Sequence, residues 1–180
     1  MKEELSPAVQ LTMNLYKGGY YCSEALLRAF NEIYNLGFPE EHLKIASGLG
    51  SGLGGAGCSC GTITSGAMVL GIIVGRNNKS DSEETIHQAS KKLHDEFRER
   101  NRVACCRILT RGVEWKSKDH ITRCSKYVQD TAEILEEILL TDLYQYLPQG
   151  GGKAVPKKNY IKLGIVALWK KLKSMTRVKN

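Results

Sequence analysis

Six cysteines are the side chains of this sequence best suited to chemistry, and they come from four separate segments. They are Cys22, Cys58, Cys60, Cys105, Cys106 and Cys124. The first ten residues, MKEELSPAVQ, lack the positive and apolar regions of a signal peptide, so we expect reduced thiols in the cytoplasm. Cysteines in that compartment are more often metal ligands, redox thiols or small buried apolar residues than disulfides. Tetrahedral thiolate ligation needs four directions of approach, and four segments can supply them.

Glycine dominates the segment that carries two of these cysteines. Residues 48–66 read GLGSGLGGAGCSCGTITSG and hold seven of the chain's 18 glycines in their first 14 residues. Because glycine adopts backbone angles closed to other residues, such a run allows close backbone approach to a compact anionic group. A thiolate-bound metal cluster is such a group. The run also matches G-x-G-x-x-G, but a dinucleotide site needs a preceding strand, and the residues before it predict a helix.

The apolar pattern around these segments predicts an all-α fold. We expect six helices, which cover residues 7–17, 23–35, 39–47, 62–74, 82–102 and 119–146. The sequence has no strand-like alternation of any length and no apolar run long enough to span a bilayer. The predicted architecture is a compact bundle of five to six helices around the glycine-rich cysteine loop.

The helix pattern gives each remaining cysteine a position. Cys22 stands at a helix start, where the macrodipole and the free N–H groups favour a thiolate, so we expect a lowered pKa. Cys124 shares an apolar stripe with Ile121 and should point toward the core. Of the adjacent Cys105 and Cys106, one should turn inward and the other away. Each position taken alone also fits a structural cysteine.

Charge separates the C-terminal extension from the body. Residues 150–180 hold nine Lys or Arg and no Asp or Glu, so residues 1–149 carry 17 basic against 19 acidic side chains. We therefore predict a helical cysteine domain over residues 1–149 and a basic extension over residues 150–180. In the extension, Ile161, Ile165 and Leu168 begin an apolar face beside Trp169, which predicts an amphipathic helix.

Four short boxes follow one another within residues 8–146. They are Tyr21-Cys22-Ser23-Glu24-Ala25, then Cys60-Gly61-Thr62 within the glycine-rich residues 54–71, then Cys106-Arg107-Ile108-Leu109-Thr110, and finally Cys124-Ser-Lys-Tyr-Val128. In this order they resemble a family of proteins described as redox-active and named for the cysteine signature C, G-C-A-x-x-G, C, C. The centre departs from the signature. Gly57-Cys58-Ser59 brings the closing glycine one residue early at Gly61, whereas registering on Cys60 brings Gly66 two residues late.

The resemblance implies an iron–sulfur electron carrier, as in the related all-helical module attached to split-Soret cytochromes. It implies thiolate ligation of a 2Fe-2S or 4Fe-4S cluster by one cysteine from each segment. These ligands would be Cys22, Cys60, Cys106 and Cys124, with Cys58 and Cys105 as alternates or as further ligands of a larger cluster. Backbone N–H groups would donate to the cluster sulfurs and raise the potential. These donors would come from Gly54, Gly55, Gly57 and Gly61.

Two other functions use the same cysteines. A thiol–disulfide oxidoreductase would need an attacking thiol of low pKa, such as Cys22. A structural zinc site would make the protein an adaptor. The sequence offers no nucleotide motif or acid–base pair, so we name no reaction. We expect a redox partner protein and no nucleic acid, and a homo-oligomer is compatible with the sequence.

The extension generates the first testable prediction. A basic amphipathic helix binds either an anionic lipid surface or a protein groove, and the remaining alternative is a solvated charged tail. A chain that ends at Gly150 should keep its fold and cofactor but lose this binding. Full-length protein should co-sediment with liposomes that contain anionic lipid, and less so as salt rises, which would place it at the inner face of the membrane. Failure to bind at low salt would leave protein docking as the better account.

Overall fold

The computed structural model describes residues 4–148, and the regular structure in this part of the chain is helical with no β-strand. The elements are α1 (Pro7–Lys17), α2 (Cys22–Tyr34), the 3₁₀-helix η1 (Glu40–Leu49), α3 (Gly50–Leu53), α4 (Gly61–Val74), α5 (Glu84–Asn101), α6 (Cys106–Leu109), α7 (Lys118–Thr141) and the 3₁₀-helix η2 (Tyr144–Tyr146). The predicted all-α fold around a glycine-rich loop is confirmed. The predicted helix of the extension lies outside the described residues, and the domain boundary stays a prediction.

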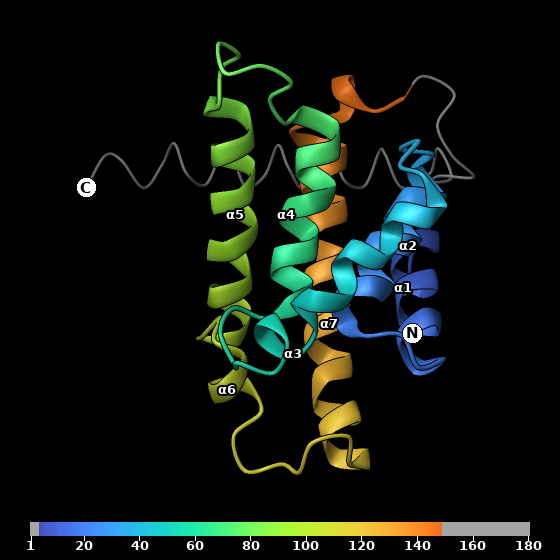
Figure 1. Ribbon diagram of the computed structural model, residues 1–180, viewed down its shortest axis with the longest axis vertical. Coiled ribbons are helices and arrows are strands. Elements are labelled where there is room, and N and C mark those ends of the chain that lie inside the picture. Colours follow the sequence, from blue (N-terminus) through green and yellow to red (C-terminus); the bar gives the residue numbers. More distant parts are fainter. Residues whose placement is uncertain (1–3, 149–180) are drawn as a thin grey trace.

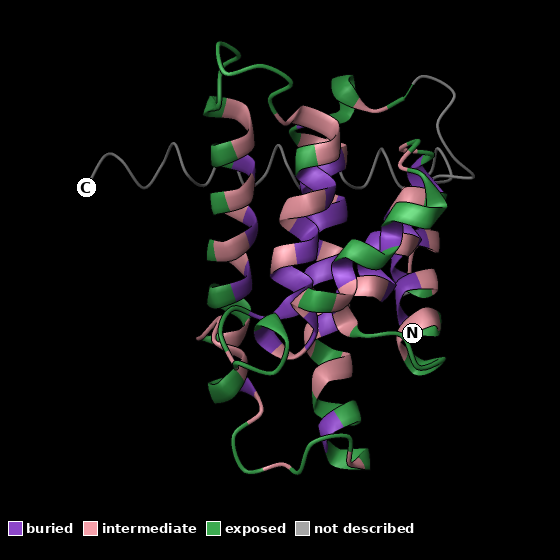
Figure 2. Ribbon diagram, in the orientation of Figure 1, coloured by how far each residue is buried: buried purple, intermediate pink, exposed green. Residues whose placement is uncertain are grey.

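Helix α4 lies at the centre of the bundle. It contacts α2, α5 and α7, while α1 covers α2 and α7. Helices α4, α5 and α7 run along the long axis of the molecule, and α1 and α2 lie beside them (Figure 1). The inward faces of α2, α4 and α7 are buried, whereas the outer face of α5 is exposed (Figure 2). This explains why the sequence of α4 is apolar on nearly every side.

Local sequence signals set the ends of the longer helices. The Ser6 hydroxyl accepts the N–H of Val9 at the start of α1, and the Ser117 hydroxyl accepts the N–H of His120 at the start of α7. Asn35 ends α2 in the left-handed conformation, with φ of 49°. None of the described helices is long and apolar enough to cross a membrane.

Three expected elements differ in detail. The helix expected over residues 39–47 is a 3₁₀-helix, and the last long helix ends at Thr141 with a separate turn at Tyr144–Tyr146. The Asp81 carboxylate accepts the N–H groups of Asn77 and Asn78 and closes the loop before α5. Ile121 was expected to face the core, but 44% of its surface is exposed because this first part of α7 extends beyond its neighbours.

The packing of α4 allows a matched pair of glycine substitutions. A Cβ at Gly66 would lie 2.6 Å from the buried Leu93 Cδ2, whereas a Cβ at Gly71 would meet nothing within 4 Å. We expect Gly66→Ala to lower the free energy of unfolding by about 1–3 kcal/mol through overpacking. Gly71→Ala should raise it by up to about 1 kcal/mol, because alanine loses less backbone entropy in a helix.

Urea denaturation of both variants and of the parent protein measures these changes as shifts of the midpoint. Equal stability of the two variants would show that Leu93 moves aside without loss and would contradict this account of the α4–α5 contact.

Candidate functional site

Four of the six cysteines line one cavity. The cavity has a volume of about 360 Å³ and is lined by Cys22, Cys60, Cys106 and Cys124 together with aromatic side chains from four segments. Each of these cysteines comes from a different helix or helix start, as the distribution of thiols along the sequence predicted. Cys60 is buried, and the other three are half-buried.

Three of the four thiols stand where a helix begins. Cys22 is the first residue of α2, Cys60 is the N-cap of α4, and Cys106 is the first residue of α6. Cys124 lies in the second turn of α7. The starts of α2 and α4 each present free N–H groups and the positive end of a helix dipole, which stabilise negative charge on sulfur. The bundle therefore brings environments that stabilise a thiolate to one place.

Backbone N–H groups are aimed at the two most enclosed thiols. Gly61 and Thr62 present backbone N–H groups toward the Cys60 thiol, and the Thr62 hydroxyl lies 3.3 Å from Cys60 Sγ. The Ile63 N–H donates to Cys60 O at 3.0 Å. The N–H of Ser51 donates toward the Cys22 thiol. A thiolate that accepts several N–H groups is stabilised in its charged form, which suits a metal ligand.

Two glycines let these segments approach closely. A Cβ at Gly61 would lie 2.9 Å from Cys22 Sγ, and a Cβ at Gly52 would lie 2.6 Å from Cys106 Cβ. Gly52 also has φ of 71°, a left-handed angle that favours glycine. Any other residue at either position would push two of the cavity-lining thiols apart. The glycine-rich segment therefore forms a wall of the cavity, as expected from its composition.

A short backbone pairing holds the Cys58–Cys60 segment beside the Cys105–Cys106 pair. Ser59 and Cys105 form an antiparallel bridge, with the N–H of Cys60 donating to Ala104 O at 2.8 Å and the N–H of Cys106 donating to Cys58 O at 2.6 Å. Cys60 and Cys106 line the cavity, whereas Cys58 is exposed and the Cys105 thiol donates to Gly57 O at 3.2 Å. The vicinal pair thus has one cysteine at the cavity and one away from it.

The four glycines predicted to donate N–H groups are not all at the cavity. Gly61 lies at its wall beside Cys22. Gly57 is half-buried, and its carbonyl accepts the N–H of Arg107 and the thiol of Cys105. Gly54 and Gly55 are exposed and do not line the cavity. The N–H of Ser51, which the sequence analysis did not single out, approaches a thiol instead.

Burial raises the pKa of all four cavity thiols above the ordinary cysteine value. For Cys22 and Cys60 desolvation is the largest cause, and N–H groups oppose it only in part. Burial and the neighbouring thiols raise the pKa of Cys106 to about 12 and that of Cys124 to about 11. The predicted lowering of the Cys22 pKa is therefore wrong, because loss of hydration outweighs the helix dipole at this depth.

Several cavity residues were not identified from the sequence. The Tyr16 hydroxyl donates toward the Cys124 thiol, and His120 Nε2 lies 3.8 Å from Cys124 Sγ. The ring of Trp115 packs edge-on against His120 with centroids 4.7 Å apart. Tyr127 completes this side of the cavity. Only the His120–Cys124 spacing of four residues on one helix was visible in the sequence, as a pair that shares a face.

The described thiols surround a space and do not meet at a point. Within residues 4–148, no three His, Cys, Asp or Glu side chains are close enough together to hold a single metal ion. The four thiols instead line one cavity of about 360 Å³.

The fold and the site define a small all-helical protein whose reactive groups are thiols that line one cavity. A family profile with the description "Putative redox-active protein (C_GCAxxG_C_C)" matches residues 20–138. The chain belongs to this family of redox-active proteins. Comparisons with curated proteins and with solved structures found no match.

The pKa shifts predict the order in which the cofactor-free protein reacts with iodoacetamide. The exposed Cys58 should be alkylated first at pH 8. Cys124, with a pKa of about 11, should react about 100-fold more slowly than a thiol of ordinary pKa, because only the thiolate attacks. Its rate should rise about tenfold per pH unit from pH 7 to pH 9 without a plateau.

Peptide mapping by mass spectrometry resolves each cysteine, and Cys58→Ser should remove the fast phase alone. A cavity cysteine that reacts at the fast rate and reaches a plateau below pH 8 would contradict the burial argument and would support a thiol–disulfide exchange function.

Proposed function

We propose that this redox-active protein is an electron carrier that binds an iron–sulfur cluster through Cys22, Cys60, Cys106 and Cys124. The observation that carries the proposal is the convergence of these thiols, from four segments, on one cavity of about 360 Å³. A cluster takes its four thiolates at two or four iron atoms, so its ligands surround it. When bound, it would supply a site that gains and loses one electron.

The chemistry of the cavity wall fits such a group. The N–H groups around Cys60 and the N–H of Ser51 toward Cys22 would donate to ligand sulfurs and raise the reduction potential. A side chain at Gly61 would collide with the Cys22 sulfur, so glycine there allows the wall to approach closely. Metal binding would also hold these buried thiols as thiolates, which their raised pKa values disfavour in its absence.

The chain's own residues would hold the ligands in place. The Thr131 hydroxyl donates to Tyr127 O at 2.7 Å and lies 2.8 Å from Thr62 Oγ1, which ties α7 to the start of α4 beside Cys60. The Tyr16 hydroxyl and His120 would orient Cys124. We place the protein in the cytoplasm, free or at the inner face of the membrane.

The competing functions make different demands on the same geometry. Thiol–disulfide exchange works best with an attacking thiol whose pKa lies near the ambient pH, and burial moves the cavity thiols away from that range. A zinc site would need four sulfurs about 4 Å apart, since Zn–S bonds are about 2.3 Å long in tetrahedral geometry. The cluster is favoured because a larger group suits thiols arranged around a cavity.

Optical and metal analysis of anaerobically purified protein tests the proposal. We expect visible charge-transfer bands with bound iron and acid-labile sulfide, and paramagnetic resonance at low temperature would assign the cluster as 2Fe-2S or 4Fe-4S. A colourless protein with six titratable thiols would favour the oxidoreductase, and zinc alone would favour the adaptor.

Two pairs of cysteine variants test the ligand set. Cys60→Ala should remove the cofactor, whereas the matched Cys58→Ala should retain most of it because Cys58 is exposed outside the cavity. Cys106→Ala and Cys105→Ala should differ in the same way. Cys124→Ser should also lose the cofactor, since a serine oxygen is a poorer ligand for iron than a thiolate.

Iron and sulfide content per chain is the measurement, and circular dichroism confirms that each variant is folded. Equal loss in Cys58→Ala and Cys60→Ala would indicate a site that uses both thiols. Full occupancy in Cys124→Ser would remove Cys124 from the ligand set.

A further inference from the structure

The mouth of the cysteine cavity is ringed by apolar side chains that lie on the surface. Tyr20 and Tyr21, between α1 and α2, line one side of it, and Trp115 and Ile121 line the other. All four are large apolar residues with substantial exposure, including 49% for Trp115 and 42% for Tyr21. Single exposed apolar residues are common, but a set gathered around one opening marks an interaction site.

Charge around this opening is mainly positive. Lys17 and Lys116 line the cavity, and no Asp or Glu is among its lining residues. Residues 111–123, which form one side of the opening, contain four basic and two acidic side chains. Arg123 lies close enough to Cys124 to oppose part of the burial-driven rise in the pKa of that thiol. The basic character is local, because residues 1–149 carry a net charge of −2.

Two residues near the opening have positive φ, a conformation that non-glycine residues seldom adopt. Lys116 has φ of 61°, and Leu53, beside the cavity-lining Ser51, has φ of 69° with 59% of its surface exposed. Neither residue type favours this left-handed region. Both side chains face solvent near the cavity and do not pack into the core. This arrangement agrees with a surface that contacts another molecule.

We infer that the rim of Tyr20, Tyr21, Trp115, Ile121, Lys17 and Lys116 docks an acidic one-electron carrier protein at the mouth of the cysteine cavity. The inference rests on the proposed electron-carrier function and names its partner. In the encounter, one electron passes from the reduced donor to the cavity site, so the donor is oxidised by one electron and the site is reduced by one. No covalent bond forms or breaks.

The charge of the rim decides between occupants. A second copy of this chain would bring lysines against lysines, which disfavours a symmetric contact at this opening. The basic extension of residues 150–180 meets the same repulsion. An acidic carrier complements the lysines, and the exposed aromatic side chains supply the apolar centre that small interfaces use.

The test compares two electron donors of opposite charge. The acidic donor is a reduced plant-type 2Fe-2S ferredoxin, and the cationic donor is reduced methyl viologen. Stopped-flow spectroscopy measures the second-order rate of reduction of the full-length protein by each. Raising the salt from about 20 mM to about 200 mM should lower the ferredoxin rate at least tenfold, because steering between opposite charges is screened. The viologen rate should not fall.

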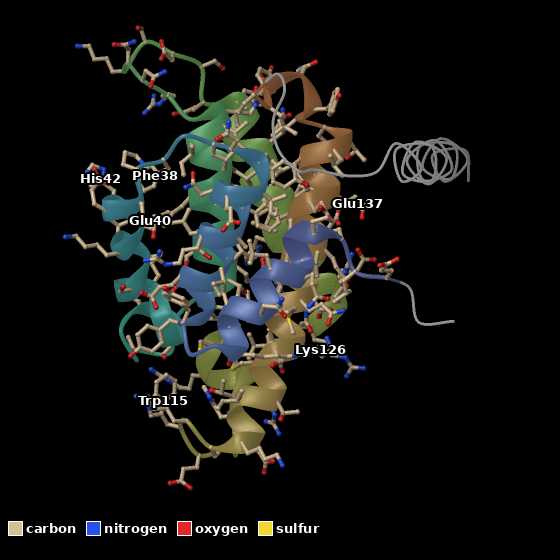
Figure 3. The ribbon with its side chains drawn as sticks, turned by 90° about the vertical axis from the view of Figure 1, so that its right-hand side faces the viewer. Phe38, Glu40, His42, Trp115, Lys126 and Glu137 are labelled. Carbon is tan, nitrogen blue, oxygen red and sulfur yellow. The ribbon has the colours of Figure 1, made fainter. Side chains whose placement is uncertain are left out.

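Variants locate the surface. Lys17→Glu with Lys116→Glu should lower the ratio of the ferredoxin rate to the viologen rate about tenfold at low salt. Arg76→Glu with Lys79→Glu is the control with the same change in net charge, because both exposed residues lie in the loop between α4 and α5, at the opposite end of the molecule from Trp115 (Figures 1 and 3). The ratio of the ferredoxin rate to the viologen rate in this control should equal that of the parent protein. Both variants carry the same basic extension, so the extension does not account for a difference between them.

The outcomes separate the docking surface from the function. If neither donor reduces the protein, the electron-carrier function fails and the docking inference fails with it. If viologen reduces the protein but neither salt nor the lysine reversals change the ferredoxin rate, only the docking inference is overturned. Carbodiimide cross-linking, which joins lysines to carboxylates, gives a readout that needs no electron transfer. Ferredoxin should cross-link to Lys17 and Lys116 and not to Lys79, and the reverse pattern would contradict the surface.

Discussion

Desolvation of four thiols in one cavity is the constraint on which the rest of the site depends. Burial alone raises their pKa values, so without a stabilising group they favour the protonated form at neutral pH. The fold opposes this effect with the starts of α2 and α4 and with N–H groups that surround Cys60. Each is too weak to reverse the shift, yet each strengthens when a cation holds the sulfur as a thiolate. A site of this kind is prepared for a positively charged group more than for free thiolate chemistry.

The glycine-rich segment forms a left-handed turn beside the desolvated thiols. Ser51, Gly52, Leu53, Gly54 and Gly55 all have positive φ. For Ser51 and Leu53 this conformation costs roughly 1–2 kcal/mol each. The turn carries the Ser51 N–H toward Cys22 and brings Gly52 against Cys106, so it contacts two of the four cavity-lining cysteines. The buried hydrogen bond between Thr131 and Thr62 then joins this end of α4 to α7. Backbone strain at the site is thus supported by the packed bundle behind it.

Local patterns predicted the helices and the four cysteine segments, because apolar periodicity and caps act over a few residues. Ser6 and Pro7 start α1 as expected, and Cys22 stands at the start of α2. The features that were missed depend on contacts distant in sequence. The bridge between Ser59 and Cys105 brings the segments of Cys60 and Cys106 side by side at the cavity. The sign of the Cys22 pKa shift follows from burial by other segments, and no local pattern brings Tyr16 to Cys124. Helix patterns therefore predicted where each thiol stands relative to a helix, but not which residues surround it.

An electron carrier has to keep its site dry enough to stabilise the cofactor and near enough to the surface to exchange electrons. For the proposed electron carrier, these two requirements correspond to different sides of one cavity. The inner wall is formed by Cys60, Thr62 and Val128, which are buried. The outer wall is formed by exposed aromatic side chains and two lysines. Because the cavity lies at one end of the bundle, the helices behind it pack without interruption, and the docking surface can change with little effect on the core.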